Sequence, residues 1–219
     1  MENRKTAAII LSGCGVCDGS EIHEAVITLL NLQRRNVRVR FFAPDIEQNG
    51  TVNHLDGTPQ QARNVLVESA RIARGDIAPL SEFSADDFDM LLLPGGFGAA
   101  KNLSDFATKG ADMSVLPQVD SAVKSMLAKG KPLGFVCIAP VIAAKSIGGG
   151  VKLTIGNDPQ TAEAVEKLGA KHVECPADGF VADESKNVFS TPAYMIAGNT
   201  AEIDAGVGAM IEAMLESVK

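Results

Sequence analysis

The chain has 219 residues, of which 46% are hydrophobic and 21% charged, with a formal net charge of −7 and an isoelectric point near 5.0. This length can bury a core without disulfides or a structural metal, so we expect a single domain over residues 1–219. The acidic balance excludes a nucleic-acid partner, because phosphate binding requires clustered Lys and Arg. One basic cluster contains Arg34, Arg35, Arg38 and Arg40. We interpret it as the solvent-exposed end of a helix and the edge that follows.

The sequence also bears on where the protein works. No long uncharged apolar run predicts a membrane span, so no membrane partner is expected. The N-terminal sequence MENRKTAAIILSG lacks a long apolar segment followed by a cleavage site, and we therefore expect a cytoplasmic location. In a reducing compartment the four cysteines are better interpreted as thiols or ligands than as disulfides.

The first part of the chain alternates strand-like with helix-like patterns. Thr6 to Leu11 and Val37 to Ala43 predict strands, and the apolar residues between 22 and 30 recur at helical spacing. The long polar stretch over residues 44–61 predicts a surface excursion, which we expect to help shape a pocket. A second helical pattern follows over residues 65–73.

The alternation continues to the C-terminus. Phe88 to Leu93 and Leu133 to Val136 are continuous apolar runs, typical of parallel strands that are buried on both faces. Beyond them we expect a strand over residues 151–155, a helix over 161–168, a hairpin around 183–187 and a C-terminal helix. The pattern predicts an α/β fold with a mainly parallel sheet, whose ligand site lies beyond the carboxyl ends of the strands.

One of the predicted strands ends at a cysteine. In GFVCIAP, residues 134–140, the apolar run stops at Cys137, and Pro140 suits the first turn of a helix. This order predicts a nucleophile elbow, in which the helix N-terminus favours a thiolate and leaves backbone N–H groups free for an oxyanion. The alternative is a buried cysteine that behaves as a small hydrophobe, and the local pattern favours neither interpretation.

A second strand ends in a glycine-rich turn. In LLLPGGFG, residues 91–98, Gly95 and Gly96 allow the backbone to turn sharply and to point N–H groups into the crevice. The turn would complete an oxyanion hole beside a nucleophile. Taken alone, it is more typical of an ordinary connection between a strand and a helix.

The glycine-rich turn over residues 12–20 permits several interpretations. It approximates a dinucleotide fingerprint, but Asp18 stands where the third glycine is needed, which disfavours a nicotinamide cofactor. Cys14 and Cys17 have C-x-x-C spacing, which fits a redox dithiol or half of a zinc site. Because no second pair accompanies them, we favour two ordinary thiols and expect neither a metal nor a cofactor.

The helix after this turn begins with acidic residues. Asp18 with Glu21, or Ser20 alone, would cap it and leave Glu24 about one turn inside, where a carboxyl can accept or donate protons. The alternative is that the glutamates complement the helix dipole from solvent. The triplet at residues 172–174 resembles the His-x-Glu of glutamine amidotransferases, but the elbow lacks the flanking glycines of that family.

Taken together, the Pro-Gly-Gly turn, the elbow and the acidic helix resemble the ThiJ/PfpI superfamily of class I glutamine amidotransferase-like proteins. Residues 12–16, 18–25, 63–66 and 96–103 narrow the resemblance to the enhancing-lycopene-biosynthesis branch, also called sigma cross-reacting protein, and it extends to residues 191–195. Cys17 departs from this branch, whose members usually have a tyrosine there. The resemblance implies a flavodoxin-like three-layer sandwich, usually a homodimer.

The resemblance also implies an activity. It places a reactive Cys137 beside Glu24, with Glu21 as the fallback for the acid/base role. The implied enzyme is a glutathione-independent, cofactor-free glyoxalase that converts glyoxal and methylglyoxal, its small dicarbonyl substrates, to glycolate and lactate. Cys137 would form a hemithioacetal, Glu24 would move protons, and the backbone N–H groups of Gly96 and Ile138 would hold the oxyanion.

Two further points follow from the resemblance. Hydrolytic members of the superfamily carry a histidine directly after the cysteine, where this chain has Ile138, so a protease activity is not expected. The alternative to an enzyme is a cysteine-based oxidative-stress sensor, or a binding protein linked to isoprenoid metabolism, in which Cys137 is oxidised to a sulfinic acid beside Glu24.

Overall fold

Seven strands form one sheet in the order β3-β2-β1-β4-β5-β9-β8, in a computed structural model that describes residues 4–218. The single domain was predicted over residues 1–219, so its first three residues and its last one lie outside the described residues. The first three residues of the N-terminal sequence used to predict the location lie outside them as well. All neighbouring strands pair in parallel except β8 with β9. The strands are β1 (Thr6–Ile10), β2 (Arg38–Ala43), β3 (Ile77–Pro79), β4 (Met90–Leu93), β5 (Leu133–Val136), β8 (Val181–Asp183) and β9 (Val188–Thr191).

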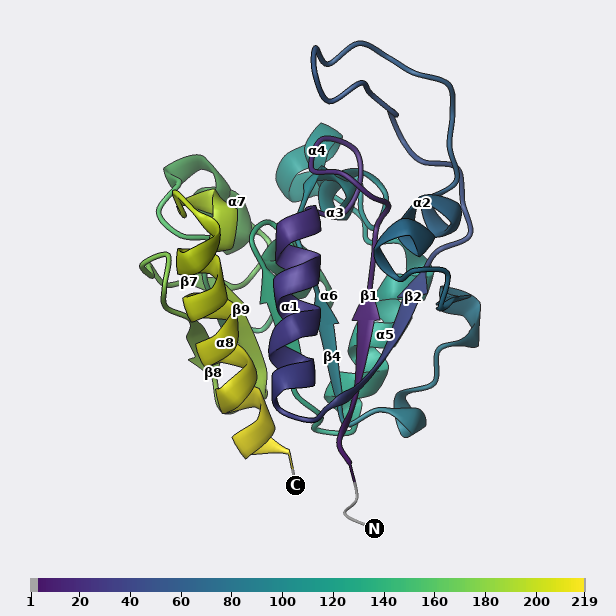
Figure 1. Cartoon of the computed structure of the whole chain (residues 1–219). Coiled ribbons are helices and arrows are strands. Elements are labelled where there is room, and N and C mark those ends of the chain that lie inside the picture. The colour runs from purple at the N-terminus through teal and green to yellow at the C-terminus, as the bar shows by residue number, and fades with distance from the viewer. Residues whose placement is uncertain (1–3, 219) are drawn as a thin grey trace.

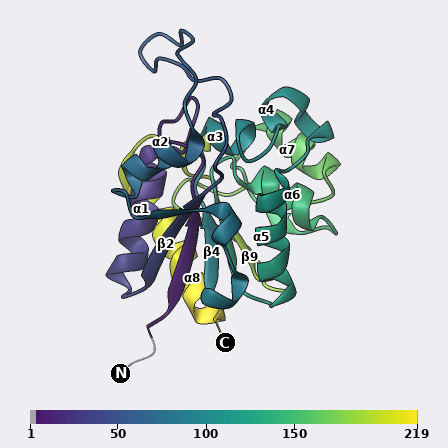
Figure 2. The ribbon, with the colours of Figure 1, turned by 90° about the vertical axis from the view of Figure 1, so that its right-hand side faces the viewer.

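Helices cover both faces of this sheet, as Figures 1 and 2 show. One layer packs α1, α2 and α8 against the sheet, and the other is built around α5 and α6. Short α3 and α4 and the longer α7 lie towards the carboxyl ends of the strands (Figure 1). The helices are α1 (Ile22–Arg34), α2 (Val65–Ile72), α3 (Phe97–Lys101), α4 (Phe106–Lys109), α5 (Pro117–Ala128), α6 (Pro140–Ile147), α7 (Pro159–Lys167) and α8 (Thr200–Ser217).

The continuous apolar runs of the central strands produce this layering. Successive side chains of a strand point to opposite faces, so Ala7 and Ile9 of β1 join the core under α1 and α8, whereas Ala8 and Ile10 join the core under α5 and α6. All four side chains are fully buried. The prediction of a flavodoxin-like, mainly parallel three-layer sandwich is confirmed.

Most of the predicted elements form, but the strand expected over residues 151–155 is shorter than predicted. It shrinks to β6 (Lys152–Leu153), which pairs only with β7 (Lys171–His172) in a separate two-stranded sheet. Side chains of the β8–β9 hairpin explain the difference, because they accept hydrogen bonds from the backbone there. Asp183 binds the N–H of Lys152 at 3.0 Å, and Ser190 binds the N–H of Thr154 at 2.8 Å.

The polar stretch after β2 projects from the carboxyl-end side of the sheet (Figure 1). It carries only isolated bridges, between Glu47 and Asn64 and between Val52 and Pro59. Within residues 4–218, every helix is too short or too polar to cross a bilayer.

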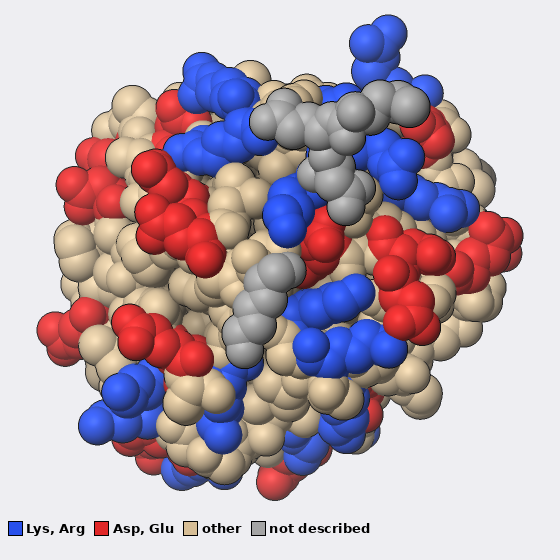
Figure 3. Space-filling model, turned by 90° about the horizontal axis from the view of Figure 1, so that it is seen from below, with Lys and Arg blue, Asp and Glu red and all other residues tan. Residues whose placement is uncertain are grey.

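Charged side chains of both signs are interspersed over the opposite end of the molecule (Figure 3). Three of the four arginines of the predicted basic cluster are engaged in ion pairs. Acids on other elements supply their partners, so much of the positive charge is locally compensated. The pairs are Arg34 with Asp204, Arg35 with Glu212 and Arg40 with Glu82.

Candidate active site

Cys137 lies at the turn between β5 and α6, with a backbone φ of +62°. Its N–H donates to the carbonyl of Thr191 at 2.9 Å, which continues the β5–β9 ladder, and Pro140 then begins α6. A residue other than glycine in the left-handed region is costly, and such residues concentrate at functional sites. The sharp turn is the nucleophile elbow that the sequence predicted, and it leaves the Cys137 side chain 7% exposed.

The Pro-Gly-Gly turn after β4 approaches Cys137 so closely that only glycine fits. A Cβ atom on Gly95 would collide with the Cβ of Cys137 and lie 2.7 Å from Oε2 of Glu24. At Gly96, where φ is +92°, it would collide with backbone atoms of Gly19 and Glu21. Both glycines therefore allow the two turns and the start of α1 to meet at one point.

Glu21, rather than Asp18 or Ser20, caps α1. Its carboxylate accepts the N–H of Glu24 at 2.7 Å. The two predicted caps are wrong because their side chains are used within the preceding turn and the long loop: Ser20 accepts the N–H of Ser12, and Asp18 accepts the N–H of Val52. The prediction that Glu24 lies about one turn inside the helix is confirmed.

The carboxyl group of Glu24 is fully buried against Cys137. It accepts backbone hydrogen bonds from Gly95 at 3.0 Å and Tyr194 at 3.3 Å, and it shares a side-chain hydrogen bond with Cys137. Burial, followed by the nearby negative charge of Glu21, raises the pKa of Glu24 to about 8, although the three hydrogen bonds oppose the shift. At neutral pH the group therefore mostly retains its proton.

The pKa of the Cys137 thiol is raised as well. Burial is the largest cause and the negative charge of Glu24 the next, whereas the backbone N–H groups of Gly96 and Ile138, which reach the sulfur, act in the opposite direction. The N–H groups at the start of the helix therefore favour the thiolate, as expected, but burial outweighs them and keeps the pKa of the thiol above its ordinary value. Protonation of Glu24 removes the second cause, so the pair is best described as sharing protons.

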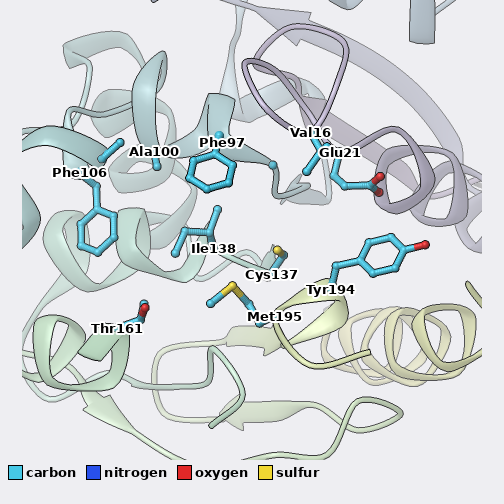
Figure 4. Close-up of a pocket in the computed structure, with 12 residues that line it drawn as sticks. Val16, Glu21, Phe97, Ala100, Phe106, Cys137, Ile138, Thr161, Tyr194 and Met195 are labelled. Atoms are coloured by element: carbon cyan, nitrogen blue, oxygen red, sulfur yellow. The ribbon is translucent and has the colours of Figure 1, made fainter. Parts of the chain in front are cut away.

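Cys137 opens into a cavity of about 340 Å³ (Figure 4). Most of its walls are apolar, and among the side chains that line it only Glu21 carries a charge. The lining comes from segments far apart in the sequence, which the sheet brings to one end. The lining residues are Val16, Glu21, Gly96, Phe97, Ala100, Phe106, Ala107, Cys137, Ile138, Thr161, Tyr194 and Met195.

The structure brings the residues predicted from the sequence together. Cys137, Glu24, Gly96 and Ile138 meet at one point, with Glu21 at the edge of the cavity. Sequence reasoning gave no role to Tyr194, whose backbone N–H holds Glu24. A signal was available, because the segment follows β9, which ends at the same edge of the sheet.

Tyr194 also connects the site to the surface. Its hydroxyl lies 2.7 Å from Nδ1 of His23, an exposed residue of α1, and its side chain lines the cavity. Figure 4 shows its ring on the same side of Cys137 as Glu21. Glu21 and Tyr194 therefore make this side the polar end of the cavity, and His23 lies outside it.

Other candidate residues from the sequence lie elsewhere. Cys14 lines a second cavity, of about 220 Å³, together with residues 48–63 of the long loop, so this loop does not line the Cys137 cavity as expected. His172 accepts the N–H of Ile155 at 3.4 Å and does not reach the elbow. In the part of the chain that the structure describes, no three His, Cys, Asp or Glu residues gather in a way that could hold a metal ion.

A family model confirms the resemblance inferred from the motifs. The model of the DJ-1/PfpI family matches residues 14–192, which include the acidic helix, the Pro-Gly-Gly turn and the elbow. The chain belongs to the DJ-1/PfpI family. It is also 45% identical to a rat protein named ES1 protein homolog, mitochondrial, over 97% of this chain and 84% of that one.

A human relative agrees with this placement and corrects the predicted location. The mitochondrial glutamine amidotransferase-like class 1 domain-containing protein 3 is 45% identical over 95% of this chain and 82% of that protein. Both relatives are named as mitochondrial, so the cytoplasmic expectation is wrong. Receptors read location from short address segments, and the composition of a folded domain does not decide it.

Solved structures share the fold. An isoprenoid biosynthesis protein with an amidotransferase-like domain from Ehrlichia chaffeensis superposes with a TM-score of 0.91 at 39% identity, covering 98% of this chain and all of that one. Glyoxalase III from Candida albicans superposes with a TM-score of 0.62 at 13% identity over 98% of each chain, which shows a common fold alone.

Proposed function

We propose that this protein is a glutathione-independent glyoxalase in which Cys137 is the nucleophile and Glu24 the acid/base. The observation that carries the proposal is the buried approach of these two side chains, which both lie against Gly95 at the end of an apolar cavity. A carboxyl group with a pKa near 8 is well matched to proton transfer at neutral pH. The N–H groups of Gly96 and Ile138, which reach the sulfur, would hold the substrate oxygen that becomes negative during the attack.

In the proposed reaction, the sulfur of Cys137 forms a bond to the aldehyde carbon of a 2-oxoaldehyde. Ionised Glu24 takes the thiol proton and passes it to the carbonyl oxygen, which gives a hemithioacetal. Glu24 then removes the hydrogen of that carbon as a proton, which gives an enediolate. The hydroxyl proton moves to the oxygen of the adjacent carbon, and Glu24 returns its proton to that carbon. Water hydrolyses the resulting thioester to a 2-hydroxy acid and free Cys137. The substrate carbons exchange oxidation state, so no external oxidant or reductant is consumed.

The test is product formation by metal-free protein without glutathione. We expect lactate from methylglyoxal and glycolate from glyoxal, identified by proton NMR and chromatography. The Cys137→Ser variant should form neither above the rate without protein. No product from the wild type, or an equal rate with Cys137→Ser, would overturn the proposal.

The alternative is an oxidative-stress sensor or a binding protein linked to isoprenoid metabolism, and the name of the Ehrlichia relative supports the isoprenoid link alone. The geometry favours the sensor less, because oxidation follows thiolate character and access, and Cys137 is buried with a raised pKa. Peroxide titration followed by mass spectrometry separates the two. Selective sulfinic acid at Cys137 in a protein without turnover would favour the sensor. The homodimer stays a prediction, which sedimentation equilibrium would test.

A further inference from the structure

The cavity beside Cys137 is larger than glyoxal or methylglyoxal requires. Its volume of about 340 Å³ is within the range of pockets that bury drug-sized ligands. A water molecule takes about 30 Å³ of liquid, so the space corresponds to roughly ten waters. Methylglyoxal carries only a methyl group beyond its two carbonyls, and most of the cavity would remain unfilled around it.

The surplus space lies on the apolar side of Cys137. In Figure 4, Glu21 and Tyr194 lie to one side of the sulfur, and Phe106 and Thr161 lie to the other. The wall beyond Cys137 is apolar, and burial of apolar substrate surface against it contributes about 25 cal/mol per Å². The apolar residues that Figure 4 labels on this side are Ala100, Phe106, Ile138 and Met195. Ala107, which follows Phe106 in α4, also lines the cavity.

Charge limits the ligands that fit. The residues that line the cavity include no Lys, Arg or His, and their one charged side chain, Glu21, is an acid. Lys101, near the mouth, donates to the carbonyl of Cys17 at 3.0 Å, and its ammonium lies 5.5 Å from the ring centroid of Phe97. A phosphate or carboxylate on the substrate would therefore enter an apolar space beside a negative charge, which is unfavourable.

We infer that the substrates of this site are neutral 2-oxoaldehydes whose substituent is an aromatic ring or a branched alkyl chain. The substituent packs against Phe106 and Met195 while Cys137 attacks the aldehyde carbon. The inference rests on the proposed glyoxalase function and uses the same steps, so the product is the 2-hydroxy acid with its substituent unchanged. Phe106, Ala107 and Met195 determine specificity and take no part in proton transfer.

The first experiment compares phenylglyoxal with methylglyoxal as substrates of the wild-type protein. We expect kcat/KM to be at least about tenfold higher for phenylglyoxal, mainly through a lower KM, because apolar pockets discriminate by this order for each added carbon. The Ala107→Trp variant, altered at an exposed position on the rim, should reduce this ratio about tenfold. The matched control is Ala128→Trp, at an exposed helix position outside the cavity, and it should keep the wild-type ratio.

A second measurement tests the cavity without glyoxalase chemistry. Iodoacetamide and N-benzyl iodoacetamide alkylate thiols in the same way, and the ratio of their rates at Cys137, mapped by mass spectrometry, cancels the thiolate fraction. We expect the ratio of the benzyl rate to the iodoacetamide rate to be about tenfold higher at Cys137 than for free cysteine. The Ala107→Trp variant should abolish this preference. If the preference holds without turnover of either substrate, the glyoxalase proposal fails and the apolar specificity stands. If methylglyoxal is turned over but neither ratio favours the aromatic compound, the specificity inference is overturned.

Discussion

Two cavities at the carboxyl end of the sheet each contain a cysteine that follows a strand and a glycine-rich or sharp turn, yet their chemistry differs. Cys137 is buried, has a positive φ and faces an apolar cavity of about 340 Å³. Cys14 is half-buried and faces a polar cavity of about 220 Å³ beneath the long loop. A cysteine in the turn that follows a strand is therefore insufficient to define a reactive site.

The buried carboxyl group beside each cysteine explains why the chemistry of the two sites differs. Glu68, beside Cys14, pairs with Arg63 at 3.1 Å and Arg71 at 2.9 Å, so cations compensate its charge. Glu24 has no cationic partner among the ion pairs of the described residues and touches a thiol and backbone N–H groups instead. Burial without a cation raises its pKa into the range useful for proton transfer, whereas an ion pair stabilises structure.

Replacement of Cys137 and of Cys14 should give the largest difference in kcat/KM between the two sites. Cys137→Ser should lower kcat/KM for methylglyoxal by at least about a thousandfold, because the hydroxyl of serine is a far weaker nucleophile in this setting. Cys14→Ser should remain within about twofold of the wild type, since Cys14 lies in the other cavity. Steady-state kinetics of both variants, with circular dichroism as the folding control, provides the comparison. A large loss in Cys14→Ser would mean that the two cavities are functionally coupled.

Replacement of the two buried acids, Glu24 and Glu68, should give the next largest difference in kcat. Glu24→Gln keeps the shape but cannot accept a proton, so kcat should fall about 100- to 10,000-fold, the range typical of general acid/base catalysis. Glu68→Gln removes the partner of Arg63 and Arg71 and should lower the melting temperature, with kcat within about twofold of the wild type. Equal losses of kcat in the two variants would contradict the acid/base role of Glu24.

The pH profile should show the titration of the Glu24–Cys137 pair. The reactive form holds one proton fewer than the form that dominates at neutral pH, because the pKa of Glu24 is raised to about 8. We therefore expect kcat/KM to rise about tenfold per pH unit below 8 and to level off near that value. In Glu24→Gln the residual rate should lose this step. A step near the ordinary pKa of a glutamate would show that Glu24 is ionised at rest.

The same shift predicts how stability depends on pH. The unfolded chain loses the Glu24 proton near 4.5, the ordinary pKa of a glutamate, whereas the folded protein keeps it to about 8. The folded state therefore binds more protons between these values, and its stability should fall as pH rises through this window. We expect the melting temperature to drop by about 5–10 °C. The Glu24→Gln variant should flatten the profile, and an unchanged profile would contradict the shift.

The smallest expected effect compares two glycines with positive φ. Gly96→Ala adds a Cβ that collides with Gly19 and Glu21, whereas Gly50→Ala, at φ +72° in the long loop, meets no atom within 4 Å. Both substitutions carry the strain of a positive φ, about 1 kcal/mol, and only the first adds a collision. We expect Gly96→Ala to be destabilised by about 2–3 kcal/mol more, measured by urea unfolding. Equal destabilisation of the two variants would mean that the turn at Gly96 can move away from Gly19 and Glu21.

The sequence by itself determined the central strands and several of the helices, because hydrophobic periodicity is a local property. Its motifs also indicated the family, and the resemblance to that family implied that Cys137 meets Glu24. The sequence could not decide which acid caps α1, since that depends on where Ser20 and Asp18 find partners. Nor could it fix the protonation of Glu24 or the shape of the cavity. Phe106, Thr161 and Met195 belong to three distant segments, and only tertiary packing brings them together, excludes water and raises the pKa of Glu24.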